Sequence, residues 1–490
     1  MFWTSKRVYM DNTATTRTRK EVIGEIKKYF DSEYANPSSI HESGLIARGS
    51  VEMARERIAG VLNCDSAEIV FTASGSESNN MAIIGAARAN RERGRHVITS
   101  KIEHSSVIKA FDALEREGFE VTRVGVDACG RVDIKELESA IRPDTILVSI
   151  HYVNNEIGTV QDIEKIISLV KSKGALFHAD AVQALPYFKI DLQALNADFM
   201  SFSGHKLYAP KGVGMLFIRN GSAIEPIIHG GGQEMGLRSG TENVAYIVGL
   251  SRAVVLNNRE KDEYCAKLLV MRSRLIDGVL KRIEECALTG DDKRRAPNHA
   301  SFVIKGVSGR MLVKRLSQRG FDVSSGSACS SPKNTPSHVL EACGVDKDYL
   351  YGNLRVTLGR YNEAGDIGRF IDALAETVRS MRENKVDYEN ETIFMSQKEF
   401  REKLAAGENM QILDVRHIKY PRVSIPGSIY IPVWMLDYRI KTLRRDVMTV
   451  VVCFQGDIVS PQVHQTLIKK GFSKVKVLKG GIFSYAGFDR

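Results

Sequence analysis

Short apolar stretches alternate with helical patterns between Glu68 and Ile218, and this alternation limits the fold more than any other feature of the chain. Residues 68–72, 96–99 and 145–150 have the pattern of buried strands, and residues 79–91 have the spacing of a helix. Strands separated by helices are typical of a mostly parallel sheet covered by helices. In such a sheet, the loops at the carboxyl ends of the strands carry the chemistry. The sequence therefore predicts an α/β fold with its functional residues in these loops.

The stretch from residue 203 to residue 214 reads as a tight, glycine-rich turn between two buried strands. Its first four residues bring together the hydroxyl of Ser203, the imidazole of His205 and the amine of Lys206. A lysine on such a turn suits a Schiff base, because its amine must lose its hydration to react at neutral pH. The alternative is a plain surface lysine, which is the commoner situation for this residue type.

Asp180 stands where another apolar stretch ends. A buried carboxylate requires a partner, and a protonated pyridine nitrogen is one such partner. Gln183, one helical turn later, would then reach a ring hydroxyl. The alternative for Asp180 is the cap of a helix.

A Gly/Ser turn follows the predicted strand at residues 68–72 and opens a helix. Backbone N–H groups at such a position bind phosphate. Gly75 and Ser76 are the predicted phosphate ligands, and a simple helix cap would have the same geometry.

Together these motifs resemble the cysteine desulfurases of the class V aminotransferase group, over residues 8–381. The stretches that carry the resemblance are Met10-Asp-Asn-Thr-Ala-Thr-Thr16, Asn36-Pro-Ser-Ser-Ile-His41, Ser74-Gly-Ser-Glu-Ser-Asn-Asn80, Glu103-His104, Val153-Asn-Asn-Glu-Ile-Gly158, His178-Ala-Asp180, Ser203-Gly-His-Lys206, Gly230-Gly-Gly-Gln-Glu234, Arg238-Ser-Gly-Thr241, Ser324-Ser-Gly-Ser-Ala-Cys329 and Leu354-Arg-Val-Thr-Leu-Gly-Arg360. Chance does not produce so many matches in this order.

The resemblance implies the cofactor and the domain plan. It implies pyridoxal 5'-phosphate (PLP) and a fold-type-I large domain (about residues 15–258) with a mostly parallel sheet. A small α/β domain would comprise about residues 1–14 and 259–385. No metal is expected.

The resemblance also assigns roles to single residues. His104 would lie over the cofactor ring and move protons with Lys206. Asn155 would contact the ring hydroxyl and the substrate carboxylate, and Arg355 would hold that carboxylate. Thr241 would reach the cofactor phosphate of a neighbouring subunit, which implies a homodimer.

Cys329 lies in a loop of small residues with prolines at positions 332 and 336. This composition disfavours helix and strand. By resemblance, Cys329 is the thiol that attacks the substrate sulfur. The alternative is an incidental loop cysteine, as we read most of the other 6 of the chain's 7 cysteines.

The bulk composition excludes some classes of protein. With 490 residues, 43% of them hydrophobic and 26% charged, the chain has the composition of a soluble protein of two to four domains. No apolar run is long enough to span a membrane. No C-x-x-C pair occurs, so neither a disulfide framework nor a zinc site is expected. We expect a cytoplasmic protein.

Positive charge is concentrated near the end of the chain. The formal net charge is +10, and 16 Lys and Arg stand against 11 Asp and Glu from residue 386 to residue 490. This excess favours acidic partners, although surface charge for solubility explains it equally well. No RNA-binding motif supports direct binding of nucleic acid.

After a polar linker at residues 386–395, residues 396–490 resemble a rhodanese-like domain. The stretches that carry this resemblance are Ile412-Leu-Asp-Val-Arg416, Ser424-Ile-Pro-Gly-Ser-Ile-Tyr-Ile-Pro432, Thr449-Val-Val-Val-Cys453-Phe-Gln-Gly456 and Leu478-Lys-Gly-Gly-Ile482. Cys453 and Gly456 fit the persulfide loop of that family, but Ile458 stands where an arginine is usual. If the loop is instead aligned from Ser460, Phe454 takes the cysteine position and the domain is inert. The domain therefore either relays sulfur through Cys453 or only docks an acceptor.

We therefore expect an enzyme that converts L-cysteine to L-alanine and passes the sulfur, as a Cys329 persulfide, to acceptor proteins. Those acceptors would serve iron–sulfur cluster assembly, tRNA thiolation or cofactor synthesis. The alternatives are a selenocysteine lyase or another class V PLP enzyme.

Overall fold

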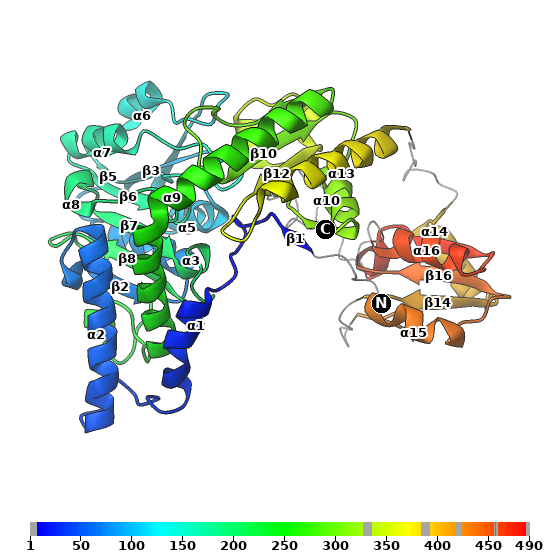
Figure 1. Cartoon of the computed structure of the whole chain (residues 1–490), viewed down its shortest axis with the longest axis horizontal. Helices are drawn as coiled ribbons and strands as arrows, with labels where there is room; N and C mark the ends of the chain where they lie inside the picture. Colours follow the sequence, from blue (N-terminus) through cyan, green and yellow to red (C-terminus); the bar gives the residue numbers. More distant parts are fainter. Residues whose placement is uncertain are drawn as a thin grey trace. The chain divides into compact units, whose positions relative to one another are not determined.

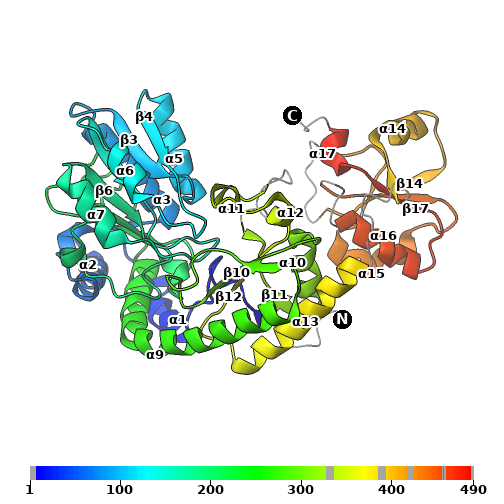
Figure 2. The same ribbon diagram turned by 90° about the horizontal axis from the view of Figure 1, so that it is seen from above.

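The computed structural model describes residues 7–326, 336–383, 393–416, 423–454, 456 and 459–486. The chain divides into two compact units, residues 1–382 and 383–490 (Figures 1 and 2). Each unit is described by itself below. Among the described residues, no helix is long and apolar enough to cross a bilayer.

A seven-stranded sheet forms the centre of the first unit, in the order β2-β8-β7-β6-β5-β3-β4. Only β8 runs antiparallel to its neighbours. The strands are β2 (Ile69–Thr72), β3 (His96–Ser100), β4 (Glu120–Val124), β5 (Thr145–Ser149), β6 (Leu176–Asp180), β7 (Phe199–Ser203) and β8 (Gly214–Ile218). Most of these strands are buried on both faces, which explains their continuous apolar runs. The predicted α/β class with a mostly parallel sheet is confirmed.

The helices around this sheet include α3 (Gly75–Asn80), α5 (Ser105–Arg116), α6 (Ile134–Ala140), α7 (Ile163–Ser172) and α8 (Leu192–Leu195). The helix predicted at residues 79–91 begins earlier, because the Ser74 side chain accepts the backbone N–H of Glu77 and caps it. From Gly75 the helical segment continues without a break through one π-helical stretch, Met81–Gly85, and α4 (Ala86–Ala89).

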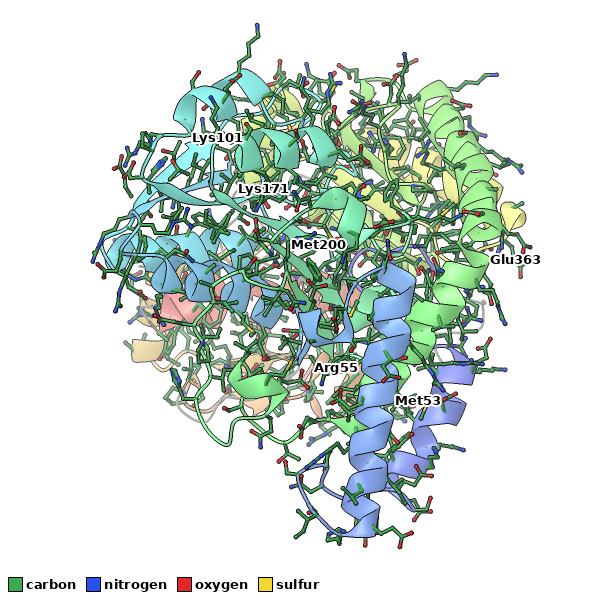
Figure 3. The ribbon with its side chains drawn as sticks, turned by 90° about the vertical axis from the view of Figure 1, so that its left-hand side faces the viewer. Met53, Arg55, Lys101, Lys171, Met200 and Glu363 are labelled. Carbon is green, nitrogen blue, oxygen red and sulfur yellow. The ribbon has the colours of Figure 1, made fainter. Side chains whose placement is uncertain are left out.

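Two further helices, α1 (Lys20–Ile26) and α2 (Glu42–Leu62), pack against α9 (Val244–Arg282). Figure 3 shows Arg55 and Met53 on different sides of α2. Met53 is exposed, whereas Arg55 is buried and pairs with the buried Glu234 at 2.8 Å. This pair attaches α2 to the loop that precedes α9.

The first unit also contains a three-stranded antiparallel sheet in the order β12-β10-β9. We call the part of the first unit that follows α9, with this sheet and its helices, the small domain. Its strands are β9 (Cys286–Leu288), β10 (His299–Ile304) and β12 (Asn353–Thr357), and its helices are α10 (Gly309–Gln318), α11 (His338–Ala342), α12 (Lys347–Leu350) and α13 (Ala364–Glu383). Near the amino terminus, β1 (Val8–Tyr9) pairs with β11 (Phe321–Asp322).

The second unit has a parallel five-stranded sheet in the order β13-β17-β16-β14-β15. The strands are β13 (Phe394–Met395), β14 (Met410–Asp414), β15 (Ile429–Tyr430), β16 (Met448–Val452) and β17 (Val475–Leu478), and the helices include α14 (Gln397–Ala405), α15 (Leu436–Arg439), α16 (Val459–Lys469) and α17 (Gly481–Tyr485). The predicted linker at residues 386–395 thus includes two residues of this sheet. Met395 is fully buried there, a placement that the polar stretch before it conceals.

Candidate active site

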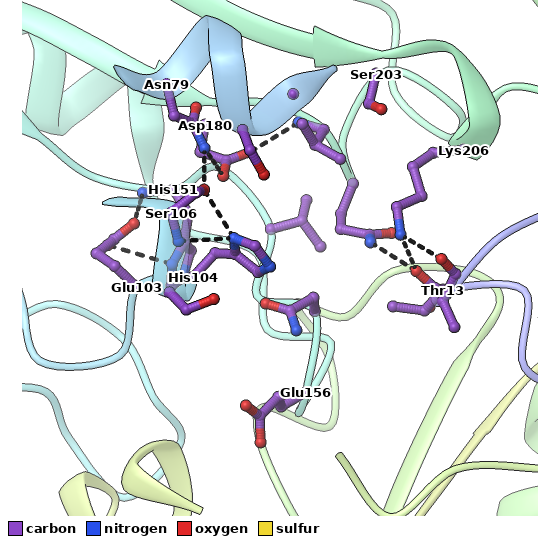
Figure 4. A pocket seen from close by; sticks show the side chains of 18 of the residues that line it. Thr13, Asn79, Glu103, His104, Ser106, His151, Glu156, Asp180, Ser203 and Lys206 are labelled. Atoms are coloured by element: carbon purple, nitrogen blue, oxygen red, sulfur yellow. Dashed lines mark hydrogen bonds and ion pairs between the residues drawn. The ribbon is translucent and has the colours of Figure 1, made fainter. Parts of the chain in front are cut away.

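A cavity of about 530 Å³ lies where loops at the strand ends of the large sheet meet residues of the small domain (Figure 4). The large sheet contributes loops that follow β2, β3, β5, β6 and β7, and the small domain contributes Ser324, Gly326, His338 and Arg355. Ten of the predicted site residues line this cavity: Gly75, Ser76, His104, Asn155, Asp180, Gln183, Ser203, His205, Lys206 and Arg355. Cys329 lies outside the described residues.

Lys206 ends the short 3₁₀ turn Gly204–Lys206 between β7 and β8. Its Nζ donates hydrogen bonds to the carbonyl oxygens of Thr13 at 2.6 Å and Ala14 at 2.7 Å. Burial lowers the pKa of the Lys206 amine to about 8, and the nearby charge of Arg355 acts in the same direction. With this pKa, roughly a tenth of the Lys206 amine is neutral and nucleophilic at pH 7, far more than for an exposed lysine.

Asp180 is the last residue of β6 and is buried. Its carboxylate accepts hydrogen bonds from Asn79 Nδ2 at 2.8 Å and from the backbone N–H of Val182 at 3.0 Å. Among the described side chains, none forms an ion pair with Asp180. The carboxylate is thus held in place by neutral donors, and its charge remains available to a cationic group in the cavity.

His104 caps α5 at the wall of the cavity. Its Nδ1 accepts the backbone N–H of Ser106 at 3.1 Å, so a neutral His104 carries its proton on Nε2. Asn79 Nδ2 donates to Ser106 Oγ as well as to Asp180, and Ser106 Oγ lies 2.8 Å from His104 Nδ1 (Figure 4). One amide therefore orients both the carboxylate and the imidazole.

The model of the family "Aminotransferase class-V" matches residues 8–370, and the model "Rhodanese-like domain" matches residues 396–487. The chain belongs to the class V aminotransferases. A curated class V relative, "Cysteine desulfurase IscS" of Methanosarcina thermophila, is 45% identical over 378 residues, which are 77% of this chain and 93% of the relative.

Solved structures of class V proteins agree with this assignment. The structure named "NIFS-LIKE PROTEIN" has a TM-score of 0.72 and 38% identity, covering 76% of this chain and 99% of its own. The structure "SspA in complex with cysteine" has a TM-score of 0.64 and 36% identity, covering 72% of this chain and 99% of its own. The predicted membership in the cysteine desulfurase group, with a rhodanese-like domain after it, is confirmed.

The class V family depends on PLP, as predicted, and the chemistry of this cavity fits that cofactor. Lys206 offers an amine of lowered pKa for the aldehyde. Asp180 offers a carboxylate held by neutral donors for the ring nitrogen. Gln183 uses its Nε2 on the carbonyl oxygen of Thr13 at 3.1 Å, which leaves its Oε1 for a ring hydroxyl.

The start of α3 is close-packed around the predicted phosphate ligands. A Cβ atom added at Gly75 would lie 2.7 Å from Val182 Cγ2 and 3.2 Å from Ser203 Cβ. Only glycine allows the backbone N–H groups here to stand so near Ser203 and the strand ends. This crowding fits a backbone cradle for a phosphate.

Arg355 lies in β12 and reaches the cavity from the small domain. It donates to the carbonyl oxygen of Asn155 and to Asp11 Oδ1, each at 3.0 Å. Arg355 is only 7% exposed, and its Nε has no partner among the described residues. A guanidinium at the wall of this cavity suits a substrate carboxylate, because its planar N–H groups can bind both carboxylate oxygens.

His205 stays neutral beside Lys206. Burial lowers its pKa to about 4, and the charges of Lys206 and Lys211 add to this effect. Its Nδ1 lies 3.1 Å from Thr15 Oγ1. His205 therefore adds no positive charge to a cavity that already contains Lys206 and Arg355.

Sequence reasoning assigned no role to several residues of the cavity. Asn79 and Thr13 are the partners of Asp180 and Lys206, and buried Glu103 Oε1 lies 3.2 Å from His151 Nδ1. Burial by itself lowers the pKa of His151, but the Glu103 carboxylate outweighs it and raises that pKa. Thr13 and Glu103 stand in stretches that carry the resemblance, yet only the fold shows what they contact.

Thr241 lines a different, smaller crevice with Phe71, Arg238 and Glu242. It is exposed and lies just before α9. It therefore does not join the ten residues around Lys206 within one chain.

Cys453 directly follows β16 in the second unit. Its Sγ accepts the backbone N–H of Gly456 at 3.2 Å, and Gly456 has a left-handed φ of 76°. The side chain of Cys453 is buried. One backbone N–H therefore points at the sulfur, as a site that binds an anionic persulfide requires. Ile458 lies outside the described residues.

Proposed function

We propose that this chain is a cysteine desulfurase that converts L-cysteine to L-alanine and keeps the sulfur as a persulfide on Cys329. The observation that carries this proposal is the cavity in which Lys206, with its lowered pKa, Asp180 and Arg355 converge. The curated relatives named cysteine desulfurase support it, and so does a cysteine complex of a structural neighbour.

In this proposal, Lys206 binds PLP, Asp180 and Gln183 orient the ring, and Gly75, Ser76, Ser203 and His205 surround the phosphate end. Bound PLP supplies an electron sink that weakens the bonds around the substrate α-carbon. Arg355 and Asn155 hold the substrate carboxylate. Lys206 and His104 move the protons, His104 through its Nε2.

The sulfur step is balanced without an outside oxidant. The Cys329 thiolate attacks the sulfur of the substrate and forms the S–S bond of the persulfide. The C–S bond of the substrate breaks, and its electron pair remains with the substrate β-carbon, which takes up a proton. The products are alanine and one persulfide, so the sulfur is oxidised and the β-carbon is reduced.

We propose a homodimer in which Thr241 contacts the partner's cofactor phosphate. Phe30, Tyr34 and Ile40 are 61%, 79% and 90% exposed, and we assign these apolar side chains to the contact with the partner. Ser38, close to them in sequence, lines a crevice with Glu242, the neighbour of Thr241. Light scattering checks this: wild type should have the mass of two chains, and Ile40→Asp should weaken the dimer.

We further propose that the rhodanese-like domain accepts sulfur from Cys329 on Cys453. The support is the Gly456 N–H directed at the Cys453 sulfur. From there the sulfur would pass to acceptor proteins, and the basic charge of this region favours acidic ones. We place the protein in the cytoplasm.

One experiment tests these assignments. Purified wild type, Cys329→Ala and Cys453→Ser are given cysteine, alanine is measured, and trapped persulfides are mapped by mass spectrometry. Wild type should carry persulfide on both cysteines, and Cys329→Ala should keep bound PLP but form neither persulfide. Cys453→Ser should still load Cys329. Persulfide on Cys329 alone in wild type would make the domain a docking module, and full activity of Cys329→Ala would reject the desulfurase mechanism.

A further inference from the structure

Glu156 stands at the wall of the cavity, between the large sheet and the small domain (Figure 4). We propose that Glu156 is a positioning residue for Cys329, because one of its carboxylate oxygens accepts a hydrogen bond from Ser337 at one end of the segment that contains this cysteine and packs closely against Gly326 at the other end. The inference rests on the proposed function, which makes Cys329 the nucleophile.

The carboxyl-terminal end of the segment is attached through Ser337. Its Oγ donates to Glu156 Oε2 at 2.6 Å, and both residues are buried. The same hydroxyl oxygen of Ser337 accepts the N–H groups of Val339 and Leu340 and so caps α11. A hydroxyl has one proton to donate, so Ser337 commits its proton to Glu156 and its lone pairs to the helix.

His338 adds a second attachment at this end. Its Nε2 donates to the carbonyl oxygen of Glu103 at 3.1 Å, and its side chain lines the cavity. The start of α11 is thus fastened to two loops of the large domain, one that follows β3 and one that follows β5.

The amino-terminal end passes against the same carboxylate oxygen. Gly326 has a left-handed φ of 64°, and a Cβ atom there would lie 2.9 Å from Glu156 Oε2. Asn353 Nδ2 donates to the carbonyl oxygen of the preceding Ser325 at 2.7 Å. The backbone therefore approaches Glu156 at residue 326 and returns to the same carboxylate oxygen at residue 337.

The Glu156 backbone is itself fixed by its neighbours. Asn154 Oδ1 accepts the backbone N–H groups of Glu156 at 2.8 Å and Ile157 at 2.9 Å, and Asn154 Nδ2 donates to the carbonyl oxygen of Ile102. Asn155, between them, accepts a hydrogen bond from Arg355 on its carbonyl oxygen. One turn therefore places the proposed carboxylate-binding pair and the attachment point of the nucleophile's segment.

This geometry predicts a specific kind of defect. Without Glu156, the substrate would still meet Lys206, Asp180 and Arg355. The segment that contains Cys329 would lose its attachment through Ser337, so the thiol would be positioned less accurately for attack. Misplacement of a reacting group by about 1 Å costs up to roughly 100-fold in rate. The loss should therefore appear in sulfur transfer rather than in substrate binding.

The test compares Glu156→Ala, Ser337→Ala and Glu156→Gln, which keeps an acceptor for the Ser337 hydroxyl. Asp346→Ala is the matched control, because it removes a helix cap of the same domain, that of α12. Each full-length protein is loaded with PLP. The visible absorbance of bound PLP reports folding, its change on adding cysteine reports substrate binding, and mass spectrometry follows persulfide on Cys329.

We expect Glu156→Ala to form this persulfide roughly 10- to 100-fold more slowly, with the cysteine-induced absorbance change retained. Ser337→Ala should fall in the same direction, while Glu156→Gln should stay within about threefold of wild type. A separate readout is limited trypsin digestion: cleavage after Lys333 should be faster in Glu156→Ala than in wild type and Asp346→Ala.

Wild-type rates of persulfide formation and of cleavage after Lys333 in Glu156→Ala would overturn the inference. A wild-type protein that never forms persulfide on Cys329 would instead reject the proposed function, and the trypsin comparison would still decide whether Glu156 fixes the segment.

Discussion

Two buried aspartates end parallel strands in the two units of this chain, and they have opposite surroundings. Asp180 ends β6, where it accepts hydrogen bonds from Asn79 and from the Val182 backbone. Asp414 ends β14 of the rhodanese-like unit, where the Arg416 guanidinium binds both of its oxygens. The Asp414–Arg416 pair is almost completely buried. An aspartate at the same point of a parallel sheet is therefore paired with an arginine in the second unit, as Asp414, and held only by neutral donors in the first, as Asp180.

The position of a buried carboxylate in the fold therefore does not decide its role; its partner does. A buried carboxylate that already has an arginine stabilises its surroundings only as long as both partners remain. A buried carboxylate held by neutral donors retains the ability to bind a cation that arrives later. This is the expected situation for a group that holds a protonated cofactor nitrogen.

The largest effect should come from breaking the buried Asp414–Arg416 ion pair. Asp414→Asn leaves the buried Arg416 charge unpaired, which should cost about 3–5 kcal/mol in the free energy of unfolding of the second unit. Trp434, one of the chain's 2 tryptophans, lies in this unit, so its fluorescence in a urea titration reports the loss. The exposed Asp437→Asn is the control and should change little. Wild-type stability of Asp414→Asn would contradict a structural role for the pair.

The second-largest effect should come from removing the charge of Asp180. Asp180→Asn keeps the shape and most hydrogen bonds but removes the charge, so alanine formation should fall roughly 100-fold. The free energy of unfolding should change far less in Asp180→Asn than in Asp414→Asn. The control for general damage to the sheet is Asp198→Asn. This variant removes another buried carboxylate, which pairs with Lys171. Near-normal turnover of Asp180→Asn would mean that the carboxylate does not act on the cofactor.

The smallest effect concerns the lysine that shares the cavity with Asp180. Burial lowers the pKa of Lys206 from 10.5 to about 8. Attachment of added PLP to the cofactor-free protein requires the neutral amine, so its rate should rise about fivefold from pH 7 to pH 8 and level off above that. Stopped-flow absorbance measures it.

The same pKa also fixes the sign of a stability effect. Between pH 8 and pH 10.5 the unfolded chain binds a proton on Lys206 that the folded protein lacks, so this group's contribution to stability rises with pH across that window. An attachment rate that keeps rising to pH 10 would show that the amine is not perturbed.

The sequence predicts the strand ends and their polar residues because buried strands have a simple apolar signature. Asp180 and Lys206 are therefore conspicuous in the sequence, each at the end of an apolar run. Their partners are not, because Thr13 and Lys206 are 193 residues apart in the chain and meet only after folding. In the sequence, the Asp414–Arg416 ion pair cannot be told apart from an active-site aspartate that stands near a basic residue.

Local capping explains the errors in element boundaries. The side chain of Ser74 starts a helix at Gly75 that apolar spacing alone places at residue 79. Similarly, the side chain of Asn243 accepts the Tyr246 N–H and starts α9 at Val244. Met395 joins a sheet through a parallel pairing with Leu478 that no local pattern near residue 395 indicates.

The single helix α9 has a mechanical consequence. Its 39 residues correspond to about 58 Å measured along the helix axis, which curves on its way from the Thr241 loop in the large domain to the strands of the small domain (Figure 1). Because α9 is continuous and has no break between the two domains, a tilt of one end is transmitted to the other end. If Thr241 contacts the partner's cofactor, then a shift of one small domain would be felt at the phosphate of the opposite subunit.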